Sequence, residues 1–157
     1  MDDTIAIAVG LVLAYLLGAA PFAYLITRAL RGIDIRRVGS RNPGALNVYR
    51  SVGKGPGLAV FALDVAKGLL AIYAVRWLGA PESAMYLAAV LVTLGHNWSA
   101  FLRFSGGKGV ATVFGISLAV FPWITLAVLP FTLAALVLTR YVVLSFAAGF
   151  ILLNVLT

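Results

Sequence analysis

The chain has 157 residues, of which 62% are apolar and 11% are charged, whereas an average soluble domain is roughly 45–50% apolar and about 25% charged. This composition argues against a soluble monomer, because so few polar residues would leave large apolar patches in water. The absence of cysteine excludes disulfides, thiolate metal sites and a cysteine nucleophile, and one histidine with five acidic residues disfavours a metal site. The net charge of +7 comes from short basic segments between apolar runs, which favours membrane surfaces and small anions over nucleic acid as partners.

Three apolar runs in the first two thirds of the chain are long enough to span a membrane, which takes roughly 20 helical residues for a core about 30 Å thick. The first run, Thr4–Thr27, is uncharged. The second extends over Gly57–Leu78. The third begins near Ala84 and reaches Phe104 only if His96 lies inside it. Each of these runs predicts a membrane-spanning segment.

The remainder of the chain is apolar from Val110 to the end, apart from Arg140. Pro122 and Pro130 interrupt it, and proline breaks helices. We expect a short helix over Val110–Phe121, a second helix that continues to Thr139, and a third from Val142 onward. The predicted fold is therefore all-α: a polytopic integral membrane helical bundle with about five to six membrane segments.

The basic residues predict the orientation of this bundle. Between Arg28 and Lys54 the sequence has seven Lys and Arg residues and one acidic residue, Asp34. Because positive charge keeps short loops in the cytoplasm, we expect this loop to be cytoplasmic and the N-terminus to lie outside. Alternating crossings then place the loop from Arg103 to Gly109 in the cytoplasm as well.

The cytoplasmic loop contains a first polar segment, Gly32–Arg50, which combines glycines, neutral donors and arginines. Glycine allows a close backbone approach, so Gly39 and Gly44 could turn N–H groups toward a ligand. Arginine offers paired donors that suit phosphate or carboxylate. An anion site is one interpretation, and a topology signal with turn glycines is the other. The neutral donors of the segment are Ser40, Asn42 and Asn47.

The second polar segment, Asp64–Gly68, places Asp64 and Lys67 three residues apart on one helical face. From the expected helix boundaries, Asp64 lies roughly 10 Å inside the span. Ionisable groups at that depth are costly, so they usually pair, line a polar cavity or have a function. The alternative is a structural pair in which Lys67 extends toward the membrane surface.

The third polar segment, Gly95–Thr112, contains the single histidine of the chain. If its first part is helical, His96, Ser99 and Arg103 form a polar stripe that faces the bundle interior. A single histidine could equally be structural. The polar residues of all three segments gather at the predicted cytoplasmic end, which suits a phosphorylated substrate from the cytoplasm and a lipidic one in the bilayer.

Within the third segment, Gly106, Gly107 and Gly109 surround Lys108 just before an apolar helix. Free N–H groups and the positive end of the helix dipole favour an anion at such a place. The segment is not a Walker loop, because Leu102 occupies the position of its first glycine. Glycines at these positions could instead permit tight helix packing.

Together the three segments resemble the motifs of the bacterial acyl-phosphate:glycerol-3-phosphate acyltransferases, integral membrane enzymes of phospholipid synthesis. The motifs of that family read GSxP, G-x-D-x-R-x-x-GS-x-N-x-GA-x-N-x-x-R, D-x-x-KG and GHxxPxFxxFxGGKGVAT. The residues that match them are Gly32, Asp34, Arg36, Gly39, Ser40, Asn42, Gly44, Ala45, Asn47, Arg50, Asp64, Lys67, Gly68, Gly95, His96, Phe101, Phe104 and Gly106 to Thr112.

The chain departs from these motifs at three positions. Ala20 replaces the serine of GSxP, Ser99 replaces the proline of the last motif, and Leu46 stands where threonine is common. Members of the family also continue with another apolar stretch and a basic C-terminal segment. We therefore expect residues 1–157 to form a single membrane acyltransferase domain that lacks the C-terminal end of the family, as a truncated form or a shortened paralogue.

The resemblance implies transfer of a fatty acyl group from acyl phosphate to the 1-hydroxyl of sn-glycerol 3-phosphate, giving 1-acylglycerol 3-phosphate and phosphate. The implied partners are these two substrates and membrane lipid, with no nucleic acid, no cofactor and no metal. The implied location is the bacterial inner membrane, as a multi-pass protein. The alternatives are a non-catalytic paralogue that binds anionic lipid headgroups and a small anion carrier, although a carrier would favour polar residues across the full membrane depth.

Under this resemblance the residues receive roles. His96 is the candidate general base, unless a substrate phosphate accepts the proton and His96 orients the substrate and donates a hydrogen bond. Lys108 and Arg36 are the other expected catalytic residues, each in a loop for one of the two phosphates, and either loop could hold either substrate. The expected substrate-binding residues are Gly39, Ser40, Asn42, Gly44, Asn47, Arg50, Asp64, Lys67, Asn97, Gly106, Gly107, Gly109 and Thr112.

Overall fold

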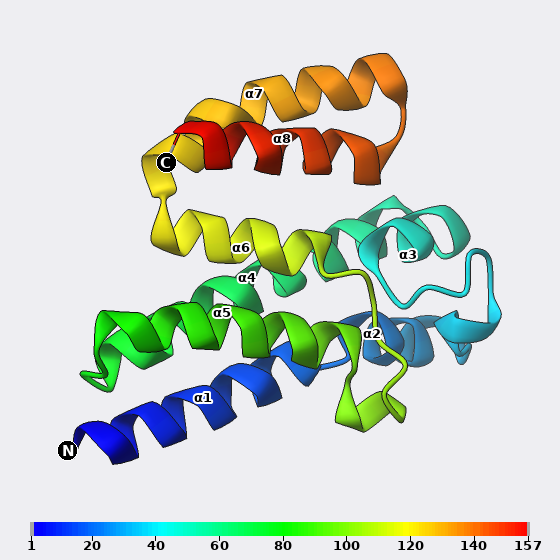
Figure 1. Cartoon of the computed structure of the whole chain (residues 1–157). Coiled ribbons are helices and arrows are strands. Elements are labelled where there is room, and N and C mark those ends of the chain that lie inside the picture. Colours follow the sequence, from blue (N-terminus) through cyan, green and yellow to red (C-terminus); the bar gives the residue numbers. More distant parts are fainter. Residues whose placement is uncertain (1, 157) are drawn as a thin grey trace. The chain divides into compact units, whose positions relative to one another are not determined.

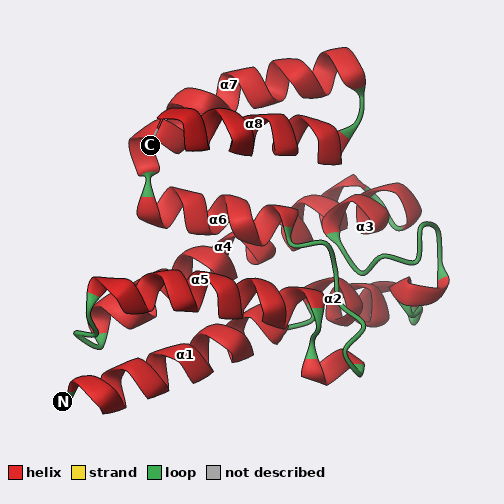
Figure 2. Cartoon of the chain, viewed as in Figure 1, coloured by secondary structure: helices red, strands yellow, loops and turns green. Residues whose placement is uncertain are grey.

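In the computed structural model, which describes residues 2–156, the chain is built from helices and loops (Figure 1). The described residues contain no strand, which confirms the all-α prediction (Figure 2). The α-helices are α1 (Asp3–Ala19), α2 (Phe22–Arg31), α3 (Ala45–Ser51), α4 (Lys54–Trp77), α5 (Glu82–Asn97), α6 (Val110–Val120), α7 (Pro122–Thr139) and α8 (Val142–Leu156). Two short 3₁₀ helices are η1 (Ile35–Arg37) and η2 (Ala100–Leu102).

Four helical segments of the described chain are long and apolar enough to cross a membrane. Two further apolar helices are shorter, so the described residues contain six apolar segments against the five to six that the sequence predicts. The cytoplasmic placement of the polar loops stays a prediction. The four long segments are Asp3–Arg31, Lys54–Trp77, Glu82–Leu102 and Pro122–Thr139, and the shorter ones are Val110–Val120 and Val142–Val155.

The first predicted span, Thr4–Thr27, lies within the apolar segment Asp3–Arg31, which is long enough to cross a membrane, but this segment is not one continuous helix. α1 ends at Ala19 and α2 begins at Phe22. The cause is Pro21, which has no N–H to donate and forces the preceding residue out of the helical region. Ala20 accordingly has an extended backbone, with φ −53° and ψ 117°. This helix break lies inside an apolar segment.

Helix α5 ends too early for the helical polar stripe expected over His96, Ser99 and Arg103. α5 stops at Asn97, and Trp98 leaves the helical region with φ −127° and ψ 67°. Arg103 has a left-handed backbone and an exposed side chain, so it does not join the other two residues. His96 and Ser99 are both buried.

The chain up to Ile116 forms one compact unit in which α1 packs along α5 and α4 (Figure 1). Small residues allow these helices to approach closely, as is common in membrane bundles. A Cβ atom at Gly18 would collide with the backbone of Val92, and one at Gly68 would collide with that of Thr112. Around the helix break lie Asp64 and Lys67 of α4 and His96 of α5.

The chain from Ser117 onward forms a second compact unit. Within it α7 and α8 pack as an antiparallel hairpin (Figure 1). Arg140 ends α7 in a left-handed conformation, and a Cβ atom at Gly149 would collide with Thr132. The helix boundaries agree with those that Pro122 and Arg140 predict.

Candidate active site

A pocket lies at the helix break between α1 and α2, where residues from all three polar segments meet. The first segment contributes Pro43, the second contributes residues of α4, and the third contributes the end of α5 and the glycine loop. The lining residues are Gly18, Ala19, Ala20, Pro21, Phe22, Ala23, Pro43, Asp64, Lys67, His96, Ser99, Leu102, Gly106 and Gly107.

Asp64 and Lys67 form an ion pair in this pocket, with Lys67 Nζ 2.8 Å from Asp64 Oδ1 and both side chains 4% exposed. The Lys67 ammonium also donates to the Ala20 carbonyl oxygen at 3.2 Å and lies 5.6 Å from the centre of the Phe22 ring. The buried charge is therefore surrounded by a carboxylate, a carbonyl and an aromatic face, the environment that an intramembrane cation requires. Lys67 is therefore held inside the helix packing and does not reach the exposed surface.

The imidazole of His96 lies next to this ion pair. Its Nδ1 is 3.2 Å from Thr112 Oγ1 and 3.7 Å from Asp64 Oδ1. Its Nε2 has no hydrogen bond to any of the described residues, and a Cβ atom at Gly107 would collide with it. The Nδ1 side of the ring thus contacts the protein. Nε2 lies beside Gly107, and both His96 and Gly107 line the pocket.

The glycine loop before α6 differs from the expected anion cradle. The Gly106 N–H donates to the Asn97 carbonyl, and the Gly107 N–H donates to the His96 carbonyl, each at 3.0 Å. These two N–H groups therefore join the loop to the end of α5 and are not free for a ligand. Lys108 is exposed, and no hydrogen bond from its N–H or that of Gly109 is formed within residues 2–156.

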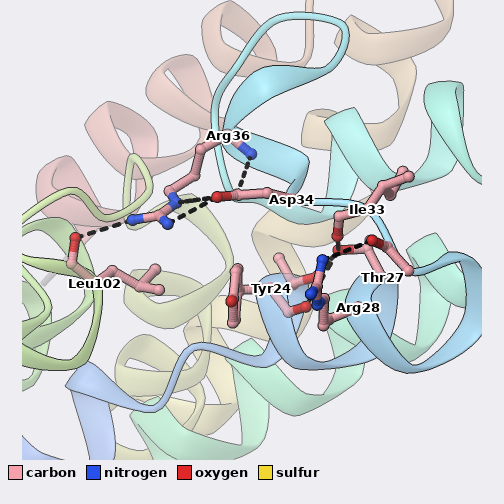
Figure 3. Close-up of polar contacts among 9 residues, drawn as sticks. Tyr24, Thr27, Arg28, Ile33, Asp34, Arg36 and Leu102 are labelled. Atoms are coloured by element: carbon pink, nitrogen blue, oxygen red, sulfur yellow. Dashed lines mark hydrogen bonds and ion pairs between the residues drawn. The ribbon is translucent and has the colours of Figure 1, made fainter.

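Arg36 connects the first polar segment to the loop after α5 (Figure 3). Its guanidinium donates to the Asp34 carboxylate at 2.8 and 3.0 Å, donates to the Leu102 carbonyl at 3.1 Å, and lies 5.3 Å from the Tyr24 ring centre. The hydrogen bond from Arg36 lowers the pKa of Asp34 and raises that of Arg36. Since Leu102 also lines the pocket, Arg36 fixes one loop of the site to another.

Asn47 holds the first polar segment in shape. Its amide nitrogen donates to the carbonyls of Ile35 and Val38 at 3.2 and 2.9 Å, and its amide oxygen accepts from the Ser40 N–H at 3.1 Å. The Gly44 N–H, which was expected to face a ligand, donates to the Asn42 carbonyl at 2.9 Å. This network fixes the turn that carries Pro43.

The structure divides the predicted site residues into two groups. Asp64, Lys67, His96, Gly106 and Gly107 line the pocket. Thr112 stands behind His96. The substrate contacts of both groups stay predictions. The predicted residues outside the pocket lining are Arg36, Gly39, Ser40, Asn42, Gly44, Asn47, Arg50, Asn97, Lys108, Gly109 and Thr112.

The site residues predicted from the sequence include neither the helix break nor Ser99, although Ser99 belongs to the polar stripe expected to face the bundle interior. Pro21 inside an apolar run is a signal from which the break could have been predicted. Ser99 Oγ donates to the Ala19 carbonyl at 2.6 Å across 80 residues of sequence, a contact that no local pattern encodes.

Comparison with known proteins identifies relatives of this chain. Residues 8–157 match the family model described as glycerol-3-phosphate acyltransferase. Glycerol-3-phosphate acyltransferase 1 of Deinococcus radiodurans is 48% identical over 139 residues, which cover 88% of this chain and 70% of the relative. A glycerol-3-phosphate acyltransferase of a Thermoanaerobacter species is 44% identical over 146 residues, covering 91% of this chain and 73% of the relative.

Two solved structures have the same fold. The crystal structure of PlsY (YgiH), an integral membrane glycerol 3-phosphate acyltransferase, in its glycerol 3-phosphate form has a TM-score of 0.87 at 36% identity, covering 96% of this chain and 75% of that one. Its lysophosphatidic acid form has a TM-score of 0.85 at 35% identity, covering 96% and 74%. The chain therefore belongs to the glycerol-3-phosphate acyltransferase family of integral membrane proteins.

Proposed function

We propose that this protein transfers a fatty acyl group to the 1-hydroxyl of sn-glycerol 3-phosphate and that the acyl donor is acyl phosphate. The family membership and the two PlsY structures, in glycerol 3-phosphate and lysophosphatidic acid forms, support the acyltransferase activity. The observation that carries the proposal is the pocket at the helix break, where a buried cation, a carboxylate and an imidazole meet.

Acyl phosphate suits a site of this composition. The hydroxyl oxygen of glycerol 3-phosphate attacks the acyl carbonyl carbon, the bond from that carbon to the phosphate oxygen breaks, and inorganic phosphate leaves. Because phosphate is a good leaving group, the protein needs to position two anions and a hydroxyl and needs no covalent nucleophile. The cysteine-free sequence is consistent with this chemistry.

His96 is the proposed acceptor of the hydroxyl proton. The Asp64 carboxylate 3.7 Å from Nδ1 favours the tautomer in which Nδ1 bears the hydrogen, and Thr112 Oγ1 at 3.2 Å can accept it. That tautomer leaves the lone pair on Nε2, beside Gly107 in the pocket wall. A substrate phosphate is the competing proton acceptor, and the pH experiment in the Discussion separates the two.

The loops that carry Lys108 and Arg36 are the proposed phosphate sites. Lys108 and the unpaired N–H of Gly109 precede α6, whose N-terminal dipole also favours an anion. The loop around Arg36, Ser40 and Asn42 serves the second phosphate.

The site then faces the cytoplasm of a bacterial cell, with the chain in the inner membrane. Cysteines introduced at Arg41 and Ser105 of the cysteine-free chain should react with a membrane-impermeant thiol reagent only after the cells are opened. Reaction of both in intact cells would reverse this topology.

The experiment that tests the proposed activity is a donor competition with purified full chain in lipid. Labelled glycerol 3-phosphate is supplied with acyl phosphate, acyl-coenzyme A or acyl-carrier protein. We expect labelled lysophosphatidate from acyl phosphate alone, with one phosphate released per product. Product from the thioester donors at an equal rate would overturn the proposed donor, and the absence of product from all three would overturn the activity.

A further inference from the structure

The helix break leaves backbone groups in an apolar segment without their usual helical partners. With Pro21 in the chain, the Ala19 and Ala20 carbonyls receive no i+4 hydrogen bond among the described residues. The Phe22 N–H donates to the Ala20 carbonyl at 3.1 Å, whereas the Ala19 carbonyl has no backbone partner among the described residues. Unpaired backbone groups inside an apolar segment are costly, and side chains can satisfy them. Ser99 Oγ donates to the Ala19 carbonyl at 2.6 Å, and Lys67 Nζ gives the Ala20 carbonyl a second donor at 3.2 Å.

These two contacts, two further contacts of Asp64 and the backbone between them form a ring of residues that line the pocket. Lys67 continues to the Asp64 carboxylate at 2.8 Å, and the same carboxylate oxygen lies 3.7 Å from His96 Nδ1. His96 and Ser99 are joined only by the backbone of the two residues between them, where α5 ends. Every member lines the pocket: Ser99, Ala19, Ala20, Lys67, Asp64 and His96.

We propose that Ser99 is a positioning residue for acyl transfer, because its hydroxyl fixes the helix break against the end of α5 and so sets where the Lys67 ammonium lies. Ser99 is 2% exposed, and its single hydroxyl hydrogen is used by the Ala19 carbonyl. Without that bond the break can shift, and Ala20 then no longer holds Lys67 beside Asp64 and His96. This inference rests on the proposed function, since the reaction is its readout.

A second bond between the same two parts of the chain provides a matched control. Tyr15 Oη donates to the Trp98 carbonyl at 2.9 Å, joining α1 to the residue before Ser99. This bond is exposed, and neither partner lines the pocket. If these bonds only hold α1 to α5, removing either hydroxyl should have a similar effect on the reaction. If Ser99 is a positioning residue, only its removal should lower the rate.

The test uses the full chain in lipid with Ser99→Ala, Ser99→Thr and Tyr15→Phe. We expect Ser99→Ala to lower kcat on the order of tenfold, the usual effect of one lost hydrogen bond, with less change in KM for glycerol 3-phosphate. Ser99→Thr keeps the hydroxyl and should recover most of the rate, and Tyr15→Phe should remain close to the unaltered protein. In a Lys67→Met background, Ser99→Ala should cause little further loss, because the effect acts through Lys67.

The single histidine supplies a readout that does not depend on activity. In protein labelled with ¹⁵N-histidine, Ser99→Ala should move the imidazole resonances of His96, Ser99→Thr should restore them, and Tyr15→Phe should leave them in place. If Ser99→Ala does not fold, Ser99→Cys, which keeps only a weak donor, takes its place and should move the His96 resonances relative to the unaltered protein.

Unchanged kcat and unchanged His96 resonances in Ser99→Ala would overturn the proposal. An equal loss with and without Lys67 would also overturn it, because the loss would then not pass through the ring. A protein that forms no product would refute the proposed function, while the resonances would still decide whether Ser99 positions the ring.

Discussion

Asp64 and Lys67 lie one helical turn apart on α4, and Lys67 Nζ is 2.8 Å from Asp64 Oδ1. Each side chain is only 4% exposed. Removing one partner leaves an uncompensated charge in a buried site, which typically costs about 3–5 kcal/mol. We therefore expect Asp64→Asn to lower the thermal unfolding midpoint sharply. The measurement is thermal unfolding of purified protein in detergent.

The double variant Asp64→Leu with Lys67→Met controls that prediction. Apolar replacements of a buried ion pair are often neutral for stability, so the midpoint should return toward that of the unaltered protein. Acyl transfer should nevertheless stay low, because the pocket has lost its cation. Recovery of both stability and activity would show that the pair has no part in the reaction.

The role of His96 can be separated from that of the substrate phosphate by His96→Gln. If Nε2 accepts the proton, the variant should lose on the order of 10²–10⁴-fold in rate, whereas a residue that only donates a hydrogen bond should be replaced by glutamine with a far smaller loss. Substrate phosphates titrate near pH 6, so the unaltered protein alone is ambiguous. The decisive measurement is the pH dependence of the residual His96→Gln activity. An acid limb that persists unchanged would assign the titration to the substrate.

The ion pair of Asp34 with Arg36 predicts a dependence of stability on pH. The hydrogen bond from Arg36 holds the pKa of Asp34 below its ordinary value of 3.8. The stabilisation is therefore fully present above pH 3.8 and is lost as the pH falls through the lowered value. Because the pair is partly exposed, its size should be about 1 kcal/mol or less.

The comparison for this prediction is Asp34→Asn, whose side chain cannot ionise. Its thermal midpoint should lie below that of the unaltered protein at pH 6, and the difference should shrink as the pH falls below 3.8. A constant difference over this range would contradict the assignment. Arg36 should also keep its contact with Leu102 in this variant.

More of the fold than of the site could be predicted from the sequence. Runs of apolar residues and the positions of Pro122 and Arg140 locate α6, α7 and α8, because helix length and helix breaking are local properties. Pro21 breaks the first span by the same rule. The bond from Ser99 to Ala19 could not be predicted, since it depends on the packing of distant helices.

The backbone hydrogen bonds of the glycine loop could not be predicted from the sequence. Glycines around Lys108 are compatible with free N–H groups, but the bonds of Gly106 and Gly107 to the end of α5 are set by the tertiary structure. What the sequence does indicate correctly is that these positions need glycine. At Gly107 the reason is the imidazole of His96, which occupies the space of a side chain.

The central claim is that acyl transfer takes place in the pocket where Gly107 faces His96. The most direct test is the rate of lysophosphatidate formation from acyl phosphate and glycerol 3-phosphate by the unaltered protein, Gly107→Ala and Gly55→Ala. A methyl group at Gly107 displaces the imidazole and should lower the rate on the order of 10²-fold. Gly55 has open space around it, so Gly55→Ala should keep the full rate. Equal rates in all three proteins would contradict the claim.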